Sequence, residues 1–393
     1  MRRSALLEGI RMLKFGKIHE RYEREELSQV EAAELLGISE RTFRRWCGRY
    51  REDGVAGLED RRLGTPARTR VPEAEADGVA ALYRTRYAGF TARHFHEHLV
   101  QSHGFRWGYT WTKSLLQRRS LLPKARRRGA HRRKRPRRPL PGMMLHQDAS
   151  RHEWVAGAPA CDLVVTLDDA TGAIYSAILV AEEGTASSFA GLLETFTAQG
   201  LPGSLYTDRG SHYFTTPKAG GRVNRGEPTQ VGRALRQLGI EHIAAYSPQA
   251  RGRSERAFRT LQDRLPKELA LAGIGTVAAA NAWLRESYIA AYNARFAVPA
   301  EQPGSAFVAL SGIDLREVLC HEEARQVGPD NTVVLAKVRL QIPPGPLRAH
   351  YVRAMVRVRR YADGRHAIFH GPRCLGRYGI DGCLEATGSK HAA

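Results

Sequence analysis

The chain has 393 residues, of which 42% are hydrophobic, so it is long enough for two or three domains, and a disordered or fibrous chain is excluded. Its formal net charge of +21 indicates a polyanionic partner, and nucleic acid comes before an acidic membrane surface. No run of about 18 apolar residues and no secretory segment is present, which predicts a soluble, intracellular protein. Five scattered cysteines argue against a disulfide framework.

Residues 1–62 are predicted to form a helix-turn-helix DNA-binding domain. Two short helical patterns within 27–51 meet at Gly37-Ile38-Ser39, where Ser39 is placed to cap the second helix. The expected core consists of Ala32, Leu35, Leu36, Ile38 and Phe43. The expected DNA contacts of the second helix are Arg41, Thr42, Arg44 and Arg45. An ordinary helical hairpin is the alternative.

Residues 70–122 are predicted to form a second helical, helix-turn-helix-like DNA-binding domain. Apolar positions recur through Val79, Leu82 and Tyr83, and the pattern continues through Phe95, His98 and Leu99. The last helix carries Lys113 and Arg118 as candidate DNA contacts, and a packing helix with solvating charges is the alternative. The histidines at 94, 96 and 98 alternate, so we expect them to fan out around their helix, and no spacing indicates structural zinc.

Residues 123–141 contain ten Lys or Arg among four prolines and are predicted to be a linker. Placed between a DNA-reading region and a catalytic core, Arg132, Arg133 and Arg135 could lie along phosphates. A solvated segment or a nuclear-localisation signal would have the same composition.

The region from 142 to 300 is predicted to be an α/β core with a mixed sheet. Three β-rich runs suggest an antiparallel meander, and a helix at 185–199, a strand at 204–208, a helix at 228–238, a strand near 240–246 and a helix from 252 follow. After another helix at 276–295 and a connector at 301–328, residues 329–393 predict a small basic β-barrel that binds DNA.

Three short motifs in the core concentrate carboxylates. Asp148 lies in HQDAS on the first strand, Asp208 ends the strand of YTDRGS, and Glu255 lies in a helix after SPQARGRS. Asp208 follows Asp148 by 60 residues, and Glu255 follows Asp208 by 47. Asp168 and Asp169 lie in a hairpin turn and are expected to be structural, and the pair at 182–183 is expected to face solvent.

These motifs make the chain resemble the integrase-core (retroviral integrase-like) DDE transposases of bacterial insertion sequences, most closely the ISNCY-type group. The resemblance implies a ribonuclease-H-like fold that brings together Asp148, Asp208 and Glu255 as catalytic metal ligands. It implies a bacterial, cytoplasmic, nucleoid-associated enzyme that acts on terminal inverted repeats and target DNA, as a homo-oligomer on paired ends.

The residue types suit this chemistry. Carboxylate oxygens are the ligands that Mg²⁺ or Mn²⁺ prefers, and two ions roughly 3.5–4 Å apart can activate the attacking oxygen and stabilise the leaving one. The arginines near Glu255 are candidate phosphate contacts: Arg251, Arg253, Arg256 and Arg259.

Two features depart from the family pattern. Related enzymes often carry Lys or Arg seven residues after the Glu, where this chain has Gln262. A Gly-rich insertion at 215–229 also lengthens the interval between Asp208 and Glu255, and could be a loop over the DNA or a solvent-exposed excursion.

The predicted function is metal-dependent cleavage and strand transfer at the ends of an insertion sequence. A non-catalytic, sequence-specific DNA-binding regulator is the alternative, and the complete carboxylate set argues against it. A nuclease acting on RNA–DNA hybrids would leave the flanking DNA-binding regions unexplained.

Overall fold

The computed structural model describes residues 3–59, 71–124, 136–218, 221–246, 252–345 and 348–385. The chain divides into two compact units, Met1–Leu82 and Tyr83–Ala393, and helix α4 (Glu73–Arg86) crosses the division. No helix within the described ranges combines the length and apolar character needed to cross a bilayer.

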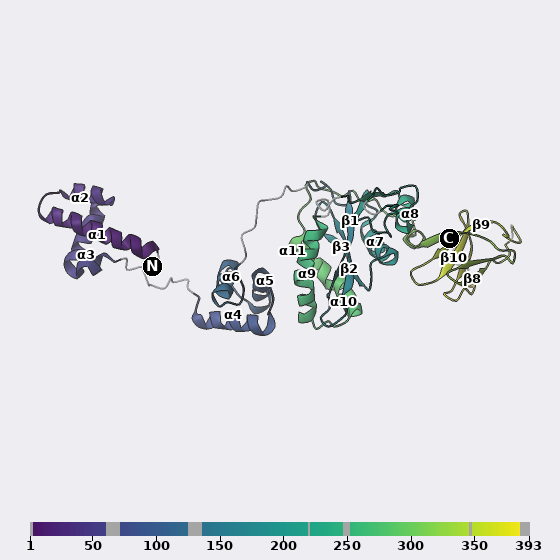
Figure 1. Ribbon diagram of the computed structural model, residues 1–393, viewed down its shortest axis with the longest axis horizontal. Helices are drawn as coiled ribbons and strands as arrows, with labels where there is room; N and C mark the ends of the chain where they lie inside the picture. The colour runs from purple at the N-terminus through teal and green to yellow at the C-terminus, as the bar shows by residue number, and fades with distance from the viewer. Residues whose placement is uncertain are drawn as a thin grey trace. The chain divides into compact units, whose positions relative to one another are not determined.

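The first unit contains the predicted helix-turn-helix (Figure 1). Its elements are α1 (Arg3–Glu23), α2 (Gln29–Leu36), α3 (Glu40–Asp53) and the 3-10 helix η1 (Gly54–Leu58). Gly37 ends α2 in the left-handed conformation at φ 67°, and the Ser39 hydroxyl accepts a hydrogen bond from the amide of Thr42, so the predicted turn and cap are confirmed.

The core of this unit differs in part from the predicted one. Ala32 and Phe43 are buried as expected, but Leu35 is 46% exposed, which makes its prediction wrong. Helix α1 supplies Phe15, which is fully buried and packs against the Phe43 ring at 6.0 Å. Because α1 covers the face that Leu35 does not reach, the core forms among three helices.

After the end of α4, the second unit continues with two helices of the second helical block, α5 (Ala92–His103) and α6 (Tyr109–Arg118). Thr91 caps α5 by accepting from the amide of His94, and Gly104 ends it at φ 61°. Phe95 and Leu99 are buried, as the periodicity predicted.

A five-stranded mixed sheet forms the centre of the second unit, with the strand order β3-β2-β1-β4-β5. The strands are β1 (Leu145–His152), β2 (Cys161–Asp168), β3 (Ile174–Val180), β4 (Ser204–Thr207) and β5 (Glu241–Ala244). β1, β2 and β3 pair antiparallel, and β4 and β5 continue the sheet parallel to β1, so the predicted mixed sheet is confirmed.

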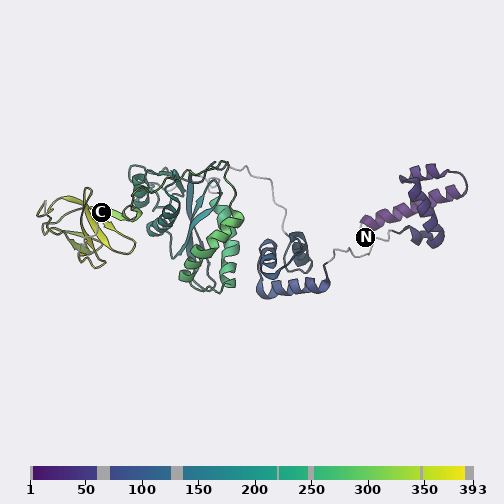
Figure 2. The same ribbon diagram turned by 180° about the vertical axis from the view of Figure 1, so that it is seen from behind.

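Helices cover both faces of this sheet (Figures 1 and 2). Those of one face are α7 (Thr185–Gln199) and α8 (Gln230–Gln237), and those of the other are α9 (Ser254–Leu271), α10 (Val277–Trp283), the π-helical η3 (Leu284–Tyr288) and α11 (Ile289–Phe296). β2 is buried along its whole length, because both of its faces are covered.

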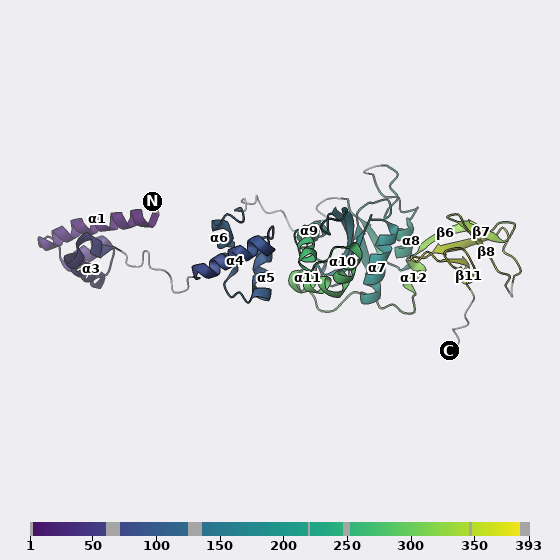
Figure 3. The ribbon, with the colours of Figure 1, turned by 90° about the horizontal axis from the view of Figure 1, so that it is seen from below.

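The C-terminal strands form open sheets (Figure 3). After α12 (Leu315–Val318) they are β6 (His321–Gln326), β7 (Thr332–Leu335), β8 (Val338–Gln341), β9 (Met355–Arg360), β10 (His366–His370) and β11 (Arg373–Tyr378). The order β11-β10-β9-β6 and a separate β7-β8 pair leave unpaired edges among the described strands, so the predicted closed barrel is not confirmed. β6 also lies in the stretch predicted as a connector.

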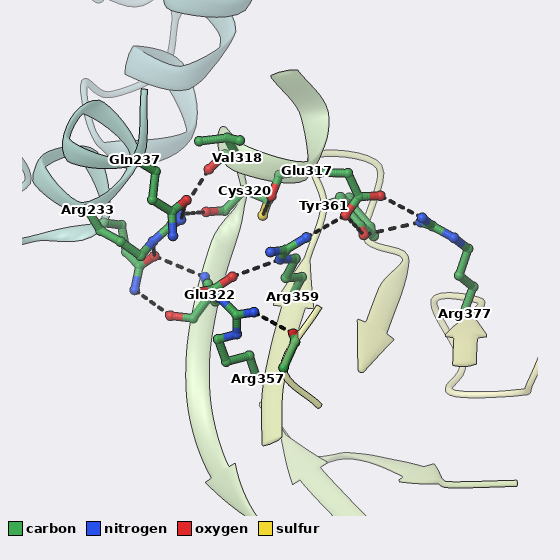
Figure 4. A network of polar contacts seen from close by, with 12 residues as sticks. Arg233, Gln237, Glu317, Val318, Cys320, Glu322, Arg357, Arg359, Tyr361 and Arg377 are labelled. Carbon is green, nitrogen blue, oxygen red and sulfur yellow. Dashed lines mark hydrogen bonds and ion pairs between the residues drawn. The ribbon is translucent and has the colours of Figure 1, made fainter. Parts of the chain in front are cut away.

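Polar contacts join α8 to this C-terminal sheet (Figure 4). Arg233 donates to the carbonyls of Val318 at 3.0 Å and Cys320 at 2.5 Å. Glu322 of β6 accepts from Arg359 of β9 at 2.8 Å, and Glu317 accepts from the same guanidinium. Because both carboxylates accept hydrogen bonds from Arg359, this arginine of β9 is neutralised within the protein.

Candidate active site on the mixed sheet

The two aspartates of the predicted site lie on neighbouring strands at one level. β1 and β4 are parallel, with Leu145 opposite Leu205 and His146 opposite Tyr206. Continuing this offset by two residues brings Asp208, directly after β4, opposite Asp148. Residues at one level of adjacent parallel strands project to the same side of the sheet.

The turn after β4 holds the second aspartate in place. The Asp208 side chain accepts a hydrogen bond of 2.8 Å from the amide of Gly210. A Cβ atom at Gly210 would lie 3.0 Å from that carboxylate oxygen and 3.1 Å from the ring of His212. The close approach therefore favours glycine at this position.

A buried tyrosine lies within the electrostatic influence of both aspartates. Burial raises the pKa of Tyr213 well above its usual value, and the negative charges of Glu183, Asp208 and Asp148 raise it further. The phenol donates to Gln147 at 3.0 Å. Its environment shows that both aspartates lie near one buried polar centre.

Glu183 was predicted to face solvent, and this prediction is wrong. Its carboxylate lies 3.5 Å from His212 Nε2 and 3.4 Å from the Tyr213 hydroxyl oxygen, whereas Glu182 is exposed. Glu182 and Glu183 lie beyond the end of β3, in an irregular segment, so strand alternation does not assign their side chains. No local pattern in the sequence therefore distinguished Glu183 from Glu182.

The predicted third ligand, Glu255, lies in the first turn of α9, and its side chain is exposed. Among the described residues, the one group of three metal-ligating side chains with ligand atoms within 4.8 Å of one another is His94, His98 and Glu268. The structure therefore aligns Asp148 with Asp208 but does not gather Glu255 with them at that distance. The five residues at 247–251, just before α9, lie outside the described part.

Asp168 and Asp169 have the structural role predicted for them. Asp168 accepts hydrogen bonds from the amides of Thr171 at 2.8 Å and Gly142 at 3.0 Å. Asp169 is fully buried and accepts from His146 Nε2 at 2.7 Å and from the amide of Arg138 at 2.8 Å.

Arg253, predicted as a DNA contact, completes this buried network. Its guanidinium pairs with the Asp169 carboxylate at 3.2 Å, donates to the Asp169 carbonyl, and donates to the carbonyl of Pro136 at 2.7 Å. Burial alone would raise the pKa of Asp169, but hydrogen bonds from His146 and Arg138, with the charge of Arg253, lower it below its usual value. Arg253 thus holds the chain just before Glu255.

The departure at Gln262 also has a structural counterpart. Its side-chain amide donates a hydrogen bond of 2.9 Å to the hydroxyl of Ser150, on the strand that carries Asp148. This contact joins α9 to β1.

The other predicted DNA contacts fall into three groups. The exposed ones are Arg41, Arg44, Arg45, Lys113, Arg118, Arg256 and Arg259. Thr42 is half-buried, and its hydroxyl bonds with Ser39 at 3.0 Å as part of the helix cap. Arg132, Arg133, Arg135 and Arg251 lie outside the described residues.

The Gly-rich insertion is tied to the core through its described residues. Thr215 bridges to Asn224, Arg209 donates to the carbonyl of Gly221 at 2.7 Å, and Arg236 donates to that of Arg225 at 2.9 Å. It folds back on α8 and the Asp208 turn.

Comparisons with known proteins identify the chain. A family model described as a helix-turn-helix domain matches residues 18–67. The chain is 33% identical over 343 residues to the putative transposase y4bF of Sinorhizobium fredii (strain NBRC 101917 / NGR234), covering 86% of this chain and 74% of that protein. It is 28% identical over 297 residues to the transposase for insertion sequence IS1202 of Streptococcus pneumoniae, covering 66% of this chain and 63% of that one.

Solved structures give a weaker likeness. The catalytic core of HTLV-2 integrase in complex with magnesium matches 38% of this chain and 88% of its own, at 17% identity and a TM-score of 0.29. A simian T-cell lymphotropic virus intasome in complex with PP2A regulatory subunit B56 gamma matches 74% and 91%, at 15% identity and a TM-score of 0.32.

The relationship to y4bF, at 33% identity over 86% of this chain, establishes the family. The chain belongs to the family of insertion-sequence transposases, and it is an enzyme of the polynucleotidyl transferase type with a helix-turn-helix region.

Proposed function

We propose that this transposase is a DDE enzyme in which Asp148, Asp208 and Glu255 hold divalent cations, Mg²⁺ or Mn²⁺, for cleavage and strand transfer at the ends of its element. The observation that carries the proposal is the common register level of Asp148 and Asp208 on parallel strands. The strand order β3-β2-β1-β4-β5, with three antiparallel strands followed by two strands parallel to β1, supports a ribonuclease-H-like core.

The donor set fits such cations. All three side chains offer hard carboxylate oxygens, the ligand type of Mg²⁺ and Mn²⁺. Two bound ions would supply charge stabilisation to the attacking and leaving oxygens of the phosphodiester. Glu255 has to approach the aspartates, and its exposed position in the first turn of α9 leaves it room to do so.

The chain's own groups position these ligands. The amide of Gly210 orients Asp208. The ion pair between Arg253 and Asp169 holds the chain before α9. Gln262 fixes α9 to β1. In the first step a water oxygen bonds to phosphorus at the element end and the 3′-oxygen leaves as a hydroxyl. In the second step that 3′-hydroxyl attacks a target phosphodiester and displaces its 3′-oxygen.

The DNA contacts follow from the exposed cations. The arginines of α3 would enter a major groove of the terminal repeat, and Arg256 and Arg259 would meet phosphates beside Glu255. The basic segment 123–141 would lie along the backbone, and two copies would act on paired ends.

The test is cleavage and joining of labelled element-end DNA with Mg²⁺ or Mn²⁺. Asp208→Asn and Glu255→Gln should abolish both reactions and keep DNA binding, while the exposed Glu182→Gln should react like the parent. Cleavage by Asp208→Asn at the parent's rate would contradict the metal-site assignment.

A further inference from the structure

Two histidines and a glutamate converge at the contact between α5 and α9. His94 and His98 are four residues apart on α5, so they share one face of the helix, and their ring centroids lie 5.1 Å apart. Glu268 faces them from the last turns of α9. The expectation that these histidines fan out is therefore wrong for this pair, although it holds for His96, which bonds with Thr112 instead.

The three side chains meet at a single oxygen. Glu268 Oε1 lies 2.5 Å from His94 Nε2 and 2.9 Å from His98 Nε2. His94 is completely buried, and side-chain exposure is only 16% for His98 and 22% for Glu268. Two imidazole nitrogens and one carboxylate oxygen thus converge in one small, largely buried volume.

The neighbouring cations are each paired with another carboxylate. Arg264 and Arg295 both bind Glu97 Oε2, at 2.5 and 2.6 Å, and Lys267 pairs with Asp263 at 2.6 Å. Because these cations are paired, they would repel a metal ion bound beside Glu268 less strongly than unpaired cations would.

We propose that His94, His98 and Glu268 form a binding site for a divalent transition-metal ion, with Zn²⁺ as the natural occupant. Two imidazoles and one carboxylate are a recurrent three-ligand zinc set, and they leave one tetrahedral position for water. Ligand atoms around a tetrahedral zinc ion lie roughly 3.3 Å apart, given zinc–ligand distances of about 2.0–2.1 Å. The two separations from Glu268 Oε1 would need to open by less than about 1 Å, and the two imidazole nitrogens already lie within 4.8 Å of each other.

The donor set separates this site from the carboxylate site. Imidazole nitrogen suits Zn²⁺, Co²⁺ or Ni²⁺, whereas Mg²⁺ prefers oxygen alone. A metal here would join α5 of the second helical block to α9, the helix that carries Glu255. Metal binding at this site would stabilise the protein independently of the DNA chemistry of the carboxylate site.

The experiment uses the full-length protein, stripped of metal and then titrated with Zn²⁺ in excess Mg²⁺ so that oxygen-only sites are occupied. We expect one tightly bound Zn²⁺ and a higher melting temperature with it. Substituted Co²⁺ should give the intense visible absorption of tetrahedral coordination, a readout on the unaltered protein. A parent that binds no Zn²⁺ and shows no such absorption would overturn the proposal.

Matched variants test the ligands. His98→Gln and Glu268→Gln, both partly exposed, should weaken Zn²⁺ binding by at least the ~10- to 100-fold that loss of an outer-shell partner costs. They should also remove the rise in melting temperature. His96→Gln, on the same helix but outside the cluster, should bind like the parent. If His98→Gln and Glu268→Gln bind as tightly as His96→Gln, the metal lies elsewhere and the assignment is wrong.

Discussion

Gln262 of α9 donates a 2.9 Å hydrogen bond to Ser150 of β1, two residues beyond Asp148. The family pattern often has a cation at this position, which would serve as a phosphate contact. The Gln262 amide carries no charge for a phosphate, and it is bound to the strand. Instead it fixes the distance between the strand of one proposed ligand and the helix of another, so we infer that Gln262 is a positioning residue and leave phosphate contacts to Arg256 and Arg259.

The pairing of Gln262 with Ser150 can be measured by a double-mutant cycle. Gln262→Ala and Ser150→Ala should each lower the free energy of unfolding by about 0.5–1.5 kcal/mol, because each removes the same hydrogen bond. The double variant should cost clearly less than the two single variants combined. Urea unfolding measures all three, and full additivity would show that the two side chains act independently.

Arg253 should behave as a structural residue. Arg253→Gln removes the charged partner of the fully buried Asp169, so we expect a loss of about 1–3 kcal/mol in the free energy of unfolding without DNA. The exposed Arg256→Gln should change stability by no more than about 0.5 kcal/mol.

In DNA binding the order of the two variants should be reversed, with the larger effect for Arg256→Gln. Arg256→Gln should reduce the salt dependence of binding, because a lost phosphate contact lowers the slope of log affinity against log salt by about 0.9. Equal stability of both variants, with equal losses of DNA affinity, would restore the phosphate role first assigned to Arg253.

The strand and turn positions of Asp148 and Asp208 follow from local patterns in the sequence, whereas their role as metal ligands rests on the resemblance to the family and stays a prediction. Asp208 ends an apolar strand before a glycine turn, and Asp148 lies on a β-rich run. Their common level depends on the parallel pairing of β1 with β4. This pairing places residues that are 60 apart in the sequence opposite each other, and Asp148 and Asp208 are also 60 apart. The sequence alone does not reveal the pairing.

Other features could not be read from the sequence, for physical reasons that can be named. The β7–β8 hairpin turns at Ala336 and Lys337, which adopt φ of 48° and 69° without the Asn or Gly that usually marks such a turn. The exposure of Leu35 depends on where α1 packs. The partner of His94 and His98 lies 170 residues away or more in the sequence, on α9.

The recognition helix gives a prediction about DNA specificity. Arg41, Arg44 and Arg45 are exposed on α3, whereas Thr42 bonds with Ser39. Arg44→Gln should weaken binding to the terminal repeat by about 1–3 kcal/mol if it reads a base, and relax specificity there. Competition binding with repeat and random DNA measures this, and a uniform loss on both DNAs would instead indicate a phosphate contact.

His242 should make stability depend on pH. Its ring is half-buried, stacks on Phe214 at 4.0 Å and bonds with Thr207 at 3.0 Å, and burial lowers its pKa to about 3. The folded protein therefore keeps this imidazole neutral, while the unfolded chain takes up a proton below about pH 6.5. The stabilisation is complete above pH 6.5 and is lost as the pH falls toward 3, by at most about 1.4 kcal/mol per pH unit.

Urea unfolding between pH 7 and 5 should show a shallower decline for His242→Asn than for the parent, and the exposed His350→Asn should follow the parent. Identical slopes for parent and His242→Asn would mean that His242 is protonated in the folded protein.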